Sequence, residues 1–455
     1  MFTNTTSPAP RGWGGCKRLL STVSLVVLGA GCSSLLDVKN PNNVNQDNLN
    51  NPAAAAALAN GALSATARAL GNVLTPYSEA TDELTWIGSR DAWDDLDKGY
   101  LTGITNEFVD AAFPLVAQSR WLSDEAIKRL GGFDADGKLA DRNLLARSYL
   151  YGAIAYTMIG DMFNDFPIAS DRTVAAAPLG PANMAQVYDT AVVYATRGIA
   201  IAQATGDAEL GRELTAMRAR ARHAKGVWQK LNPFSPATLA SPLVNDPAAV
   251  ADATAALAGA PADWKYQFNY SSETVSTGIG FEVNQRLESR FGDLYIVPTT
   301  DNKRVGSIRL LDPINNKPDP VLSRTINEFV AGVQYGPLTV VSSREMSLIL
   351  AEARLAQNDS VGAATFINNI RALVAADSLT PYDPLNAAHP RALAMLQHER
   401  RVNLFLQGRR LADHYRFGVP ADKWPANAEA VQQPGTVFPI TNTEILANCH
   451  IQGTC

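Results

Sequence analysis

The chain has 455 residues, of which 46% are hydrophobic and 18% are charged, and its formal net charge is −5. These values are typical of a globular protein with a large core, built as one large domain or as two to three ordinary ones. Because the chain is mildly acidic and has no block of like charge, its composition argues against a nucleic-acid partner.

The N-terminal segment has the pattern of an export signal. Three basic residues precede an apolar run at 19–28, which is shorter than the about 20 residues needed to span a bilayer. Small residues then lead into Cys32, whose thiol can carry a lipid after cleavage. We therefore expect a lipoprotein signal peptide at 1–31, lipid attachment at Cys32 and a polar tether at 32–52. Ordinary secretion with an incidental cysteine is the alternative. Since no later segment approaches membrane length, we expect membrane attachment through this lipid only.

Residues 53–231 are predicted to be mainly helical. The expected stretches are 53–70, 106–130, 140–160, 183–204 and 207–231. Residues 232–342 differ in kind, because prolines and Thr/Ser clusters separate short β-prone pieces such as DLYIVPTT and GPLTVVSS. We expect irregular structure with a few short strands there, and helix again from residue 343.

The clearest helical pair is SREMSLILAEARLAQNDSVGAATFINNIRALVAAD. Apolar residues recur at i, i+3, i+4 and i+7 on each side of the break at 358–360, which supplies an N-cap. The positions are Met346, Ile349, Leu350 and Ala353, then Ala363, Phe366, Ile367 and Ile370. Two helices joined so tightly must lie antiparallel, as in a tetratricopeptide-type unit.

The tail segment HERRVNLFLQGRRLADHYRFG, residues 398–418, is similar to the closing signature of the SusD/RagB-type nutrient-uptake lipoproteins of the bacterial outer membrane. The matching positions are Glu399, Arg400, Gly408, Arg410, Asp413, Arg416 and Gly418. Asn403 and Gln407 stand where the family usually has glutamates, and His414 and Phe417 replace its Leu and Trp.

Other stretches resemble the same family in the same order. SSREMSLILAEARL followed by AATFINNIRA looks like its paired helices, and VFPITNTEIL looks like its near-terminal segment. LLARSYLYGAIAYTMIGDMFNDFPIA resembles its aromatic-rich helix, and LDVKNPNN after the signal fits as well. The likeness therefore spans essentially the whole mature chain.

The resemblance implies one SusD-like domain over residues 53–455. Its parts would be a helical part (53–231), a loop-rich part (232–342), and a helical part with the C-terminal segment (343–455). The implied fold is mostly α, with four tetratricopeptide-like helix pairs as scaffold, a few short strands, and long loops that carry the ligand site. Such proteins are not enzymes and need no cofactor. They cover a SusC-like TonB-dependent transporter in the cell outer membrane and capture glycans or peptides for uptake.

Glycan binding needs flat aromatic faces with polar groups nearby. Residues 76–100 contain Trp86 and Trp93, with Arg90 and Asp94 as candidate partners for sugar hydroxyl groups. The seven-residue spacing would equally place both tryptophans on one helical face inside the core. The ligand-binding and core interpretations are evenly balanced for this cluster.

A second aromatic cluster lies at 263–272, in ADWKYQFNYSS. Trp264, Tyr266, Phe268 and Tyr270 alternate, which would put all four on one side of a strand. Whether that side faces a ligand or the core is open, and we take Trp264 and Tyr266 as the candidate ligand residues.

Two rival functions use the same residues. A glycoside hydrolase would need two carboxylates facing each other across a cleft; the candidates are Glu79, Asp82, Glu83, Asp94 and Asp95. A helical interaction scaffold of the cell envelope would instead keep the aromatic residues in its core. The absence of G-x-S-x-G, H-E-x-x-H and P-loop motifs argues against an enzyme.

The remaining chemistry-bearing residues are interpreted as structural. Cys449 and Cys455 are expected to form a small disulfide loop rather than a metal site. His398 is expected to be a core histidine with one hydrogen bond. The acidic segment 133–143 hints at a calcium loop, but its glycine comes too early, so a polar turn between helices is favoured.

Overall fold

The computed structural model describes residues 49–171, 173–373 and 379–455. The predicted signal peptide, Cys32 and nearly all of the predicted tether lie outside these ranges. Within them, no helix is long and apolar enough to cross a membrane.

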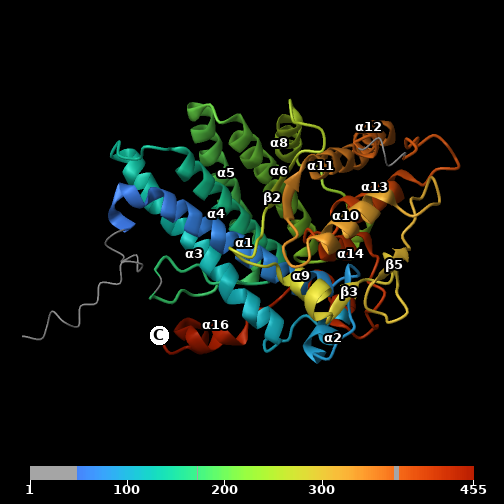
Figure 1. Ribbon diagram of the computed structural model, residues 1–455, viewed down its shortest axis with the longest axis horizontal. Helices are drawn as coiled ribbons and strands as arrows, with labels where there is room; N and C mark the ends of the chain where they lie inside the picture. Colours follow the sequence, from blue (N-terminus) through green and yellow to red (C-terminus); the bar gives the residue numbers. More distant parts are fainter. Residues whose placement is uncertain (1–48, 172, 374–378) are drawn as a thin grey trace, which may run out of the picture. The chain divides into compact units, whose positions relative to one another are not determined.

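The helices expected between residues 53 and 231 form, and they pack against one another in sequence (Figure 1). They are α1 (Ala55–Glu79), α3 (Glu107–Ala135), α4 (Asn143–Met162), α5 (Ala185–Thr205) and α6 (Ala208–Leu231), with short 3-10 turns at η2 (Pro52–Ala54) and η3 (Pro181–Asn183). Asn106 caps α3 by accepting the N–H groups of Phe108 and Val109, and Asp207 caps α6. α4 contacts α1, α3, α5 and α6, and most of its residues are therefore buried.

Helices α4 and α5 approach closely because small residues face the contact. A Cβ atom at Gly160 of α4 would lie 2.5 Å from the ring of Tyr188 on α5. A Cβ at Gly152, two turns earlier, would lie 2.7 Å from Tyr194. Both aromatic rings therefore occupy the space that a larger residue would need.

The region from 232 to 342 holds short strands, as expected, and also two helices that were not expected. The helices are α8 (Pro247–Leu257) and α10 (Pro320–Ala331), and smaller helical turns form α7 (Pro236–Ala240), α9 (Gly278–Gly280) and the π-helical segment η4 (Phe281–Arg286). The strands of the described chain pair as three antiparallel ribbons. They are β1 (Leu84–Trp86) with β3 (Ser289–Phe291), β2 (Lys265–Phe268) with β6 (Leu338–Ser342), and β4 (Ile296–Pro298) with β5 (Val305–Ile308).

The C-terminal part begins with the predicted helix pair, α11 (Ser343–Ala356) and α12 (Ser360–Arg371). Ser342 caps α11, Asn358 takes a left-handed conformation (φ 61) in the turn, and Asp359 caps α12 through the N–H of Gly362. The following helices are α13 (Ala392–Asn403), α14 (Arg410–Phe417), α15 (Glu429–Gln432), α16 (Asn442–Ala447) and α17 (Cys449–Gln452).

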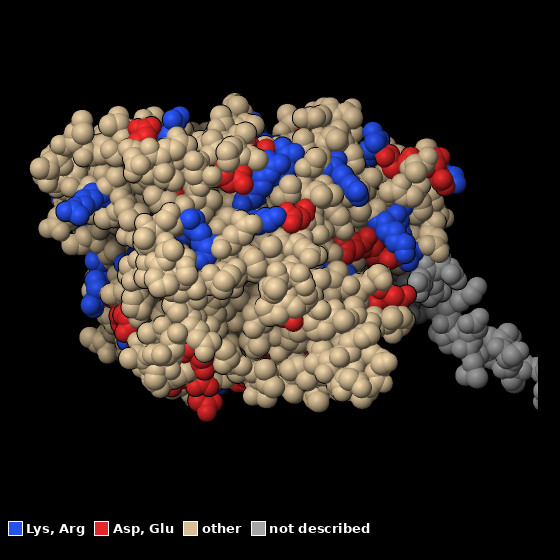
Figure 2. Space-filling model, turned by 180° about the vertical axis from the view of Figure 1, so that it is seen from behind, with Lys and Arg blue, Asp and Glu red and all other residues tan. Residues whose placement is uncertain are grey.

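One large apolar core joins the N-terminal helices, the ribbons and α14, and a smaller core lies among α11, α12 and α13. On the face opposite to that of Figure 1, charged side chains of both signs are interspersed, mostly over its upper half (Figure 2). That face carries no broad field of a single sign.

Candidate functional site

A surface groove of about 360 Å³ lies at the end of the β1–β3 ribbon. We call it the Trp86 groove. Its lining residues come from β1, α2 (Asp91–Asp97), β3, the β4–β5 turn and the segment before α15. They are Thr85, Trp86, Ile87, Gly88, Asp94, Asp97, Lys98, Arg290, Asn302 and Lys423. The groove thus combines one indole face with an amide, two carboxylates and three cations.

Trp86 is held in the groove by the pairing of β1 with β3 and by Asp97. Trp86 lies opposite Ser289 in the ribbon and is half-buried. One carboxylate oxygen of Asp97 accepts hydrogen bonds from the Trp86 backbone N–H at 3.2 Å and from the Thr85 hydroxyl at 2.7 Å. Burial raises the pKa of Asp97 to about 7, against the effect of these two hydrogen bonds.

The turn after Trp86 is fixed by Glu288. Its carboxylate accepts the backbone N–H groups of Ser89 at 2.8 Å and Arg90 at 3.2 Å, and the Ser89 hydroxyl at 3.1 Å. Burial opposes ionisation, but these hydrogen bonds lower the pKa of Glu288. A Cβ atom at Gly88 would lie 1.9 Å from the Glu288 carboxylate, so this turn requires glycine.

The charged groups of the groove are paired along its rim. Lys98 binds Asp94 at 2.6 Å, and both Lys423 and Arg290 bind Asp293, at 2.7 Å and 2.8 Å. These pairs leave hydrogen-bonding capacity toward the groove, because an ammonium group has three donors and a guanidinium group has five.

Trp93 and Arg90, expected beside Trp86, do not line this groove. Trp93 is 2% exposed and stacks on Phe108 with ring centroids 3.4 Å apart. The Arg90 guanidinium lies 4.2 Å from the centre of the same Phe108 ring and pairs with Glu107 at 2.8 Å. Trp93 and Arg90 therefore fasten α2 to the start of α3, whereas Trp86 and Asp94 border the groove.

The second aromatic cluster is also divided by the structure. Trp264 is buried and its indole N–H donates to the Glu209 carboxylate, and Phe268 is buried as well. Tyr270 is buried and its hydroxyl donates to the Ala67 carbonyl at 2.7 Å. Only Tyr266 of this cluster is half-buried rather than buried, next to a shift in the β2–β6 register.

Tyr266 borders a second cavity, of about 580 Å³, which we call the Tyr266 cavity. Arg147 and Tyr151 of α4 and Glu213 of α6 also line it. Burial, followed by the nearby Glu209 and Asp207, raises the pKa of Glu213 to about 7. This cavity offers a phenol face with mixed polar groups and is the second candidate for a sugar.

Three of the five acids of the predicted hydrolase alternative are buried, whereas Asp94 borders the Trp86 groove and Asp95 is exposed. Glu79, Asp82 and Glu83 are all at least 98% buried at the end of α1 and in the turn that follows. Asp82 binds Arg410 at 2.7 Å and 2.6 Å, and Glu83 accepts the backbone N–H of Leu406 at 2.9 Å. Asp82 and Glu83 thus tie the turn after α1 to the C-terminal segment.

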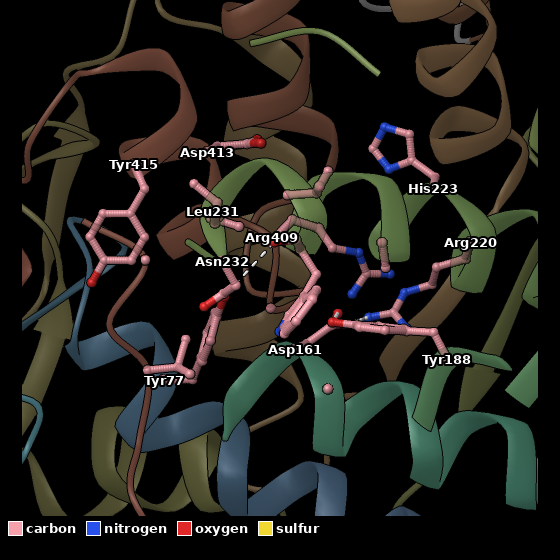
Figure 3. A pocket seen from close by; sticks show the side chains of 18 of the residues that line it. Tyr77, Asp161, Tyr188, Arg220, His223, Leu231, Asn232, Arg409, Asp413 and Tyr415 are labelled. Atoms are coloured by element: carbon pink, nitrogen blue, oxygen red, sulfur yellow. Dashed lines mark hydrogen bonds and ion pairs between the residues drawn. The ribbon is translucent and has the colours of Figure 1, made fainter. Parts of the chain in front are cut away.

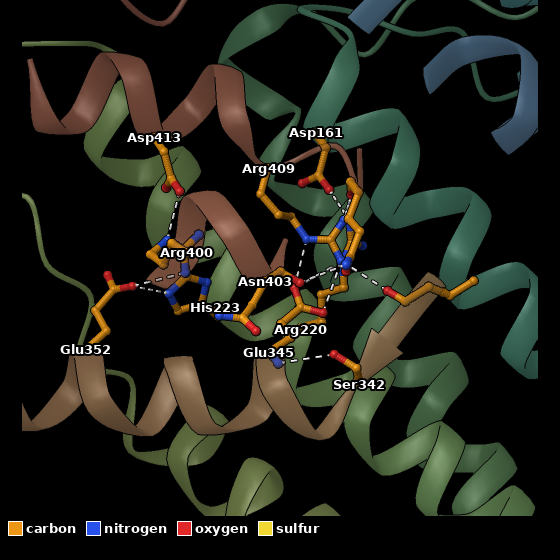
Figure 4. A network of polar contacts seen from close by, with 12 residues as sticks. Asp161, Arg220, His223, Ser342, Glu345, Glu352, Arg400, Asn403, Arg409 and Asp413 are labelled. Carbon is orange, nitrogen blue, oxygen red and sulfur yellow. Dashed lines mark hydrogen bonds and ion pairs between the residues drawn. The ribbon is translucent and has the colours of Figure 1, made fainter. Parts of the chain in front are cut away.

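The charged residues of the tail lie in a buried network of ion pairs (Figure 4). Arg409 binds Glu345 at 2.7 Å and 3.0 Å, and Arg220 binds Asp161 at 2.6 Å. A second group centres on Glu352, whose partners are His223, Arg400 and Arg416, and Asp413 bridges Arg400 to Arg416. Four helices, α4, α6, α11 and α14, meet at these charges together with the end of α13.

A cavity beside this network is too small for a sugar. Tyr77, Tyr188, Asp161, Arg220 and Arg409 point toward it (Figure 3), and its volume is about 60 Å³. Ligand pockets usually measure about 300–1,000 Å³. The tail charges are therefore part of the packing of the helices.

The chain resembles known proteins both in part of its sequence and in its fold. Residues 345–444 match the family model described as the SusD family. A SusD superfamily protein from Bacteroides thetaiotaomicron has a similar structure, with a TM-score of 0.62, 12% identity, and coverage of 88% of this chain and 98% of that chain. One from Bacteroides fragilis has a TM-score of 0.61 at 12% identity, with the same coverage.

The C-terminal part of the chain thus matches the SusD family, and its fold is similar to that of SusD superfamily structures. The predicted family and the predicted mostly α, SusD-like fold are thus confirmed. Surface glycan-binding protein A from Bacteroides uniformis is another similar structure, with a TM-score of 0.52 and 12% identity over 86% of this chain and 98% of that chain. No curated protein matches the sequence.

Within the segment that matches the SusD family, an amide stands at position 403, where the resemblance would place a glutamate, and it bridges two charges. The Asn403 carbonyl oxygen accepts from Arg344 at 2.6 Å, and its NH₂ group donates to the Glu399 carboxylate at 2.8 Å. A carboxylate at this position could not donate to Glu399 and would repel it. Glu399 in turn binds Arg371 at 2.8 Å. Asn403 therefore lies between a cation, Arg344, and a carboxylate that is already held by a second cation.

Other residues singled out in the sequence serve the packing. His398 contacts Asp319 at 3.0 Å, and Asp319 also caps α10. Asp134 in the segment 133–143 binds Arg142 at 2.7 Å and 2.9 Å between α3 and α4. Cys449 and Cys455 are joined by a disulfide near the C-terminus.

Sequence reasoning placed the site in the segment 76–100 and so missed the three residues of the Trp86 groove that lie outside it: Arg290, Asn302 and Lys423. Asn302 lies in the polar stretch TTDNKR, whose turn signal between two β-prone pieces could have indicated a loop near the site. Arg290 and Lys423 carry no comparable signal, because they reach the groove only through the packing of the ribbons and the C-terminal segment.

Proposed function

We propose that this protein captures glycans at the Trp86 groove and delivers them to a SusC-like TonB-dependent transporter in the outer membrane. Cys32 would carry the lipid that holds the protein at the membrane. The main support for this proposal is the half-buried Trp86. It borders a groove together with amide, carboxylate and cationic groups from several chain segments. An indole face suits the C–H side of a sugar ring, and the surrounding polar groups suit its hydroxyls.

The similar structures support a glycan as the ligand. One is named a surface glycan-binding protein, from Bacteroides uniformis, and another a SusD-like carbohydrate binding protein, from Bacteroides vulgatus. The family model matched by residues 345–444 supports the nutrient-uptake role. Together with the lipoprotein signal in the sequence, they favour capture at the cell surface.

Paired alanine variants test the binding site. We expect Trp86→Ala to weaken oligosaccharide binding by about tenfold or more, as for a central aromatic contact, and Tyr266→Ala to leave binding unchanged. Affinities would be measured by calorimetry after a glycan-array screen, with unfolding curves for each variant. Loss of binding in Tyr266→Ala alone would move the site to the Tyr266 cavity, and equal binding by both variants would refute the Trp86 groove.

The transporter partner is tested separately. Full-length tagged protein would be purified from detergent-solubilised native membranes, and co-purifying proteins would be identified by mass spectrometry. We expect a TonB-dependent transporter in near-equal amount, and release of the protein from the membrane fraction in Cys32→Ala. Recovery of the lipoprotein alone in every detergent would contradict the delivery role.

We infer that the protein binds glycans without cleaving them. The buried positions of Glu79, Asp82 and Glu83 favour this inference, because they cannot flank a substrate. Incubation with the oligosaccharides that bind should produce no new reducing ends. Their appearance, and their loss in Asp94→Asn, would support a hydrolase instead.

A further inference from the structure

A further cavity lies beside the Trp86 groove, with which it shares a lining residue. Its volume is about 690 Å³, and we call it the Lys303 cavity. Its walls come from η4, β3, the β4–β5 ribbon and α10. Arg290 lines both this cavity and the Trp86 groove, and Asn302 of the groove precedes Lys303 of the cavity in the chain. The cavity and the groove therefore adjoin.

The charged side chains that line the Lys303 cavity are all basic. Arg290, Lys303 and Arg304 line it, and its lining contains no Asp or Glu. This composition contrasts with the whole chain, in which 44 acidic residues outnumber 39 basic ones. The lining therefore carries an excess of positive charge. Two carboxylates lie close to these cations: Asp301, which interacts electrostatically with Lys303 and Arg304, and Asp293, which pairs with Arg290.

Lys303 and Arg304 are exposed at the cavity, whereas Arg290 is buried and partly paired. The side chains of Lys303 and Arg304 make no hydrogen bond or ion pair with any residue that the structure describes. Arg290 is 94% buried and binds Asp293 through Nη2 and the Phe291 carbonyl through Nη1. Its Nε–H group is buried without a partner in the described part of the chain.

The rest of the wall suits a sugar. Asn284, Gln285 and Asn327 supply amides, and Ser307 and Ser323 supply hydroxyls. The apolar side chains of Val330 and Val333 are also exposed there, which offers a surface for sugar C–H groups.

The backbone around the cavity is held in costly conformations. Leu287 and Val333 have φ values of 58° and 53°, in the left-handed region that a β-branched residue such as valine rarely adopts. The Asn284 amide donates to the Val333 carbonyl at 2.6 Å and to the Phe329 carbonyl at 3.2 Å, which fixes this geometry. Asn284 itself lies in the π-helical segment η4, a type of structure that often marks functional sites.

We infer that the Lys303 cavity receives an anionic sugar unit of the captured glycan, one that carries a carboxylate or a sulfate group. This inference rests on the proposed function and narrows its substrate class to acidic oligosaccharides. Lys303 and Arg304 at the rim bind the anionic group, Arg290 attracts it from the wall, and the neighbouring sugar unit lies against Trp86.

The test compares acidic and neutral probes. Binding of a uronate hexasaccharide, a sulfated hexasaccharide and a neutral mannose or glucose hexasaccharide to the full-length protein in detergent would be measured by calorimetry at two salt concentrations. We expect an acidic probe to bind, with an affinity that falls as salt rises. The acidic probe that binds identifies the anionic group as a carboxylate or a sulfate.

Two double variants with the same change in net charge complete the test. Lys303→Ala with Arg304→Ala should weaken binding of the acidic probe at least tenfold. Arg309→Ala with Lys317→Ala removes two exposed cations that do not line the cavity and should leave the affinity within twofold. Equal losses in both double variants would overturn the inference, because the effect would then come from net charge alone.

Failure of the inference and failure of the proposed function remain distinguishable. If only the neutral probe binds and Trp86→Ala abolishes its binding, glycan capture stands and the anionic cavity is refuted. If no probe and no glycan of a broad array binds to the folded protein, both are refuted.

Discussion

Asp82 is surrounded by partners that lie far from it along the chain, most of them in the C-terminal segment. Arg410 binds its carboxylate at 2.7 Å and 2.6 Å, Tyr295 donates to it at 2.9 Å, and Arg401 and His414 lie within 3.3 Å. Burial would raise the pKa of Asp82, but His414 and Arg410 lower it well below its usual range. The carboxylate is therefore ionised in the folded protein.

We expect Asp82→Asn to destabilise the fold by about 3–5 kcal/mol, because it leaves buried cations without their counter-charge. Asp94→Asn is the matched control. Asp94 has a similar partner in Lys98 at 2.6 Å, but on the surface, where such a pair contributes only about 0–1 kcal/mol. Unfolding in guanidinium chloride measures both variants, and a similar loss in each would contradict the structural role of Asp82.

Glu83 makes the free energy of unfolding fall as the pH rises. Burial raises its pKa to about 7 from the ordinary value of 4.5, so the folded state binds a proton that the unfolded state has lost. The stabilising contribution is full below pH about 4.5 and is lost as pH rises through 7.

Glu83→Gln removes this dependence while keeping an oxygen that accepts the Leu406 N–H. We expect the free energy of unfolding of the wild type to fall relative to the variant by on the order of 3 kcal/mol between pH 4.5 and pH 8. Urea unfolding over this range is the measurement. A difference between the two proteins that does not change with pH would contradict the raised pKa.

At the scale of single elements, the contact of α4 with α5 depends on glycine. Gly160→Ala would place its Cβ atom 2.5 Å from Tyr188 and 2.8 Å from Val187. We expect a loss of about 1–3 kcal/mol from the forced separation of the helices.

Gly61→Ala is the control for the glycine contact. Gly61 lies inside α1, and a Cβ atom there would meet no neighbouring atom within 4 Å, so alanine should stabilise the protein by about 0.5–1 kcal/mol. Thermal unfolding of the two variants should therefore shift in opposite directions. Stabilisation by both changes would show that helix propensity, and not the close approach, decides the effect at Gly160.

The formation of most helices could be predicted from the local sequence pattern. The apolar spacing in 343–371 predicts α11 and α12, and the turn chemistry at Asn358 and Asp359 separates them as expected. The short helices α8 and α10 were missed, because each occurs within a stretch where nearby prolines and polar clusters indicate loops. Their start is in fact set by capping aspartates, Asp246 and Asp319, each followed by proline.

The candidate site was predicted only in part, for a physical reason. The spacing of Trp86 and Trp93 suggested two residues on one helical face. The chain instead leaves β1 at Trp86, turns at Gly88 against Glu288, and begins α2 at Asp91. The two indoles therefore belong to different elements, and the distant Glu288 that fixes the turn cannot be inferred from local sequence.

At the scale of the whole molecule, Glu352 joins four elements. Its carboxylate accepts from Arg416 and from the Val244 backbone N–H at 2.8 Å, and it contacts His223 at 3.1 Å and Arg400 at 3.5 Å. Burial would raise its pKa, but Arg416 and His223 lower the pKa of Glu352 well below its usual value. Helices α6, α11, α13 and α14 are therefore coupled through one anion.

We expect Glu352→Gln to reduce the global free energy of unfolding by about 3–5 kcal/mol. Hydrogen exchange read by mass spectrometry should show α6 and α14 losing protection together. Glu107→Gln, which breaks the exposed pair with Arg90, should change stability by less than about 1 kcal/mol. Loss of protection in residues 343–455 alone would indicate that this part unfolds independently of the N-terminal helices.

The separation of these partners along the chain has a consequence for biosynthesis. Asp82 and Arg410 lie 328 residues apart. At about 5–20 residues per second, a ribosome needs about 15–65 seconds to add the arginine after the aspartate. Until then the nascent N-terminal helices hold an acid that cannot be buried as an ion. A polypeptide that ends before residue 399 would lack Arg400, Arg409, Arg410 and Arg416 together, and would stay open to proteases. The buried ion pairs around Asp82 can therefore form only after the closing signature has been synthesised.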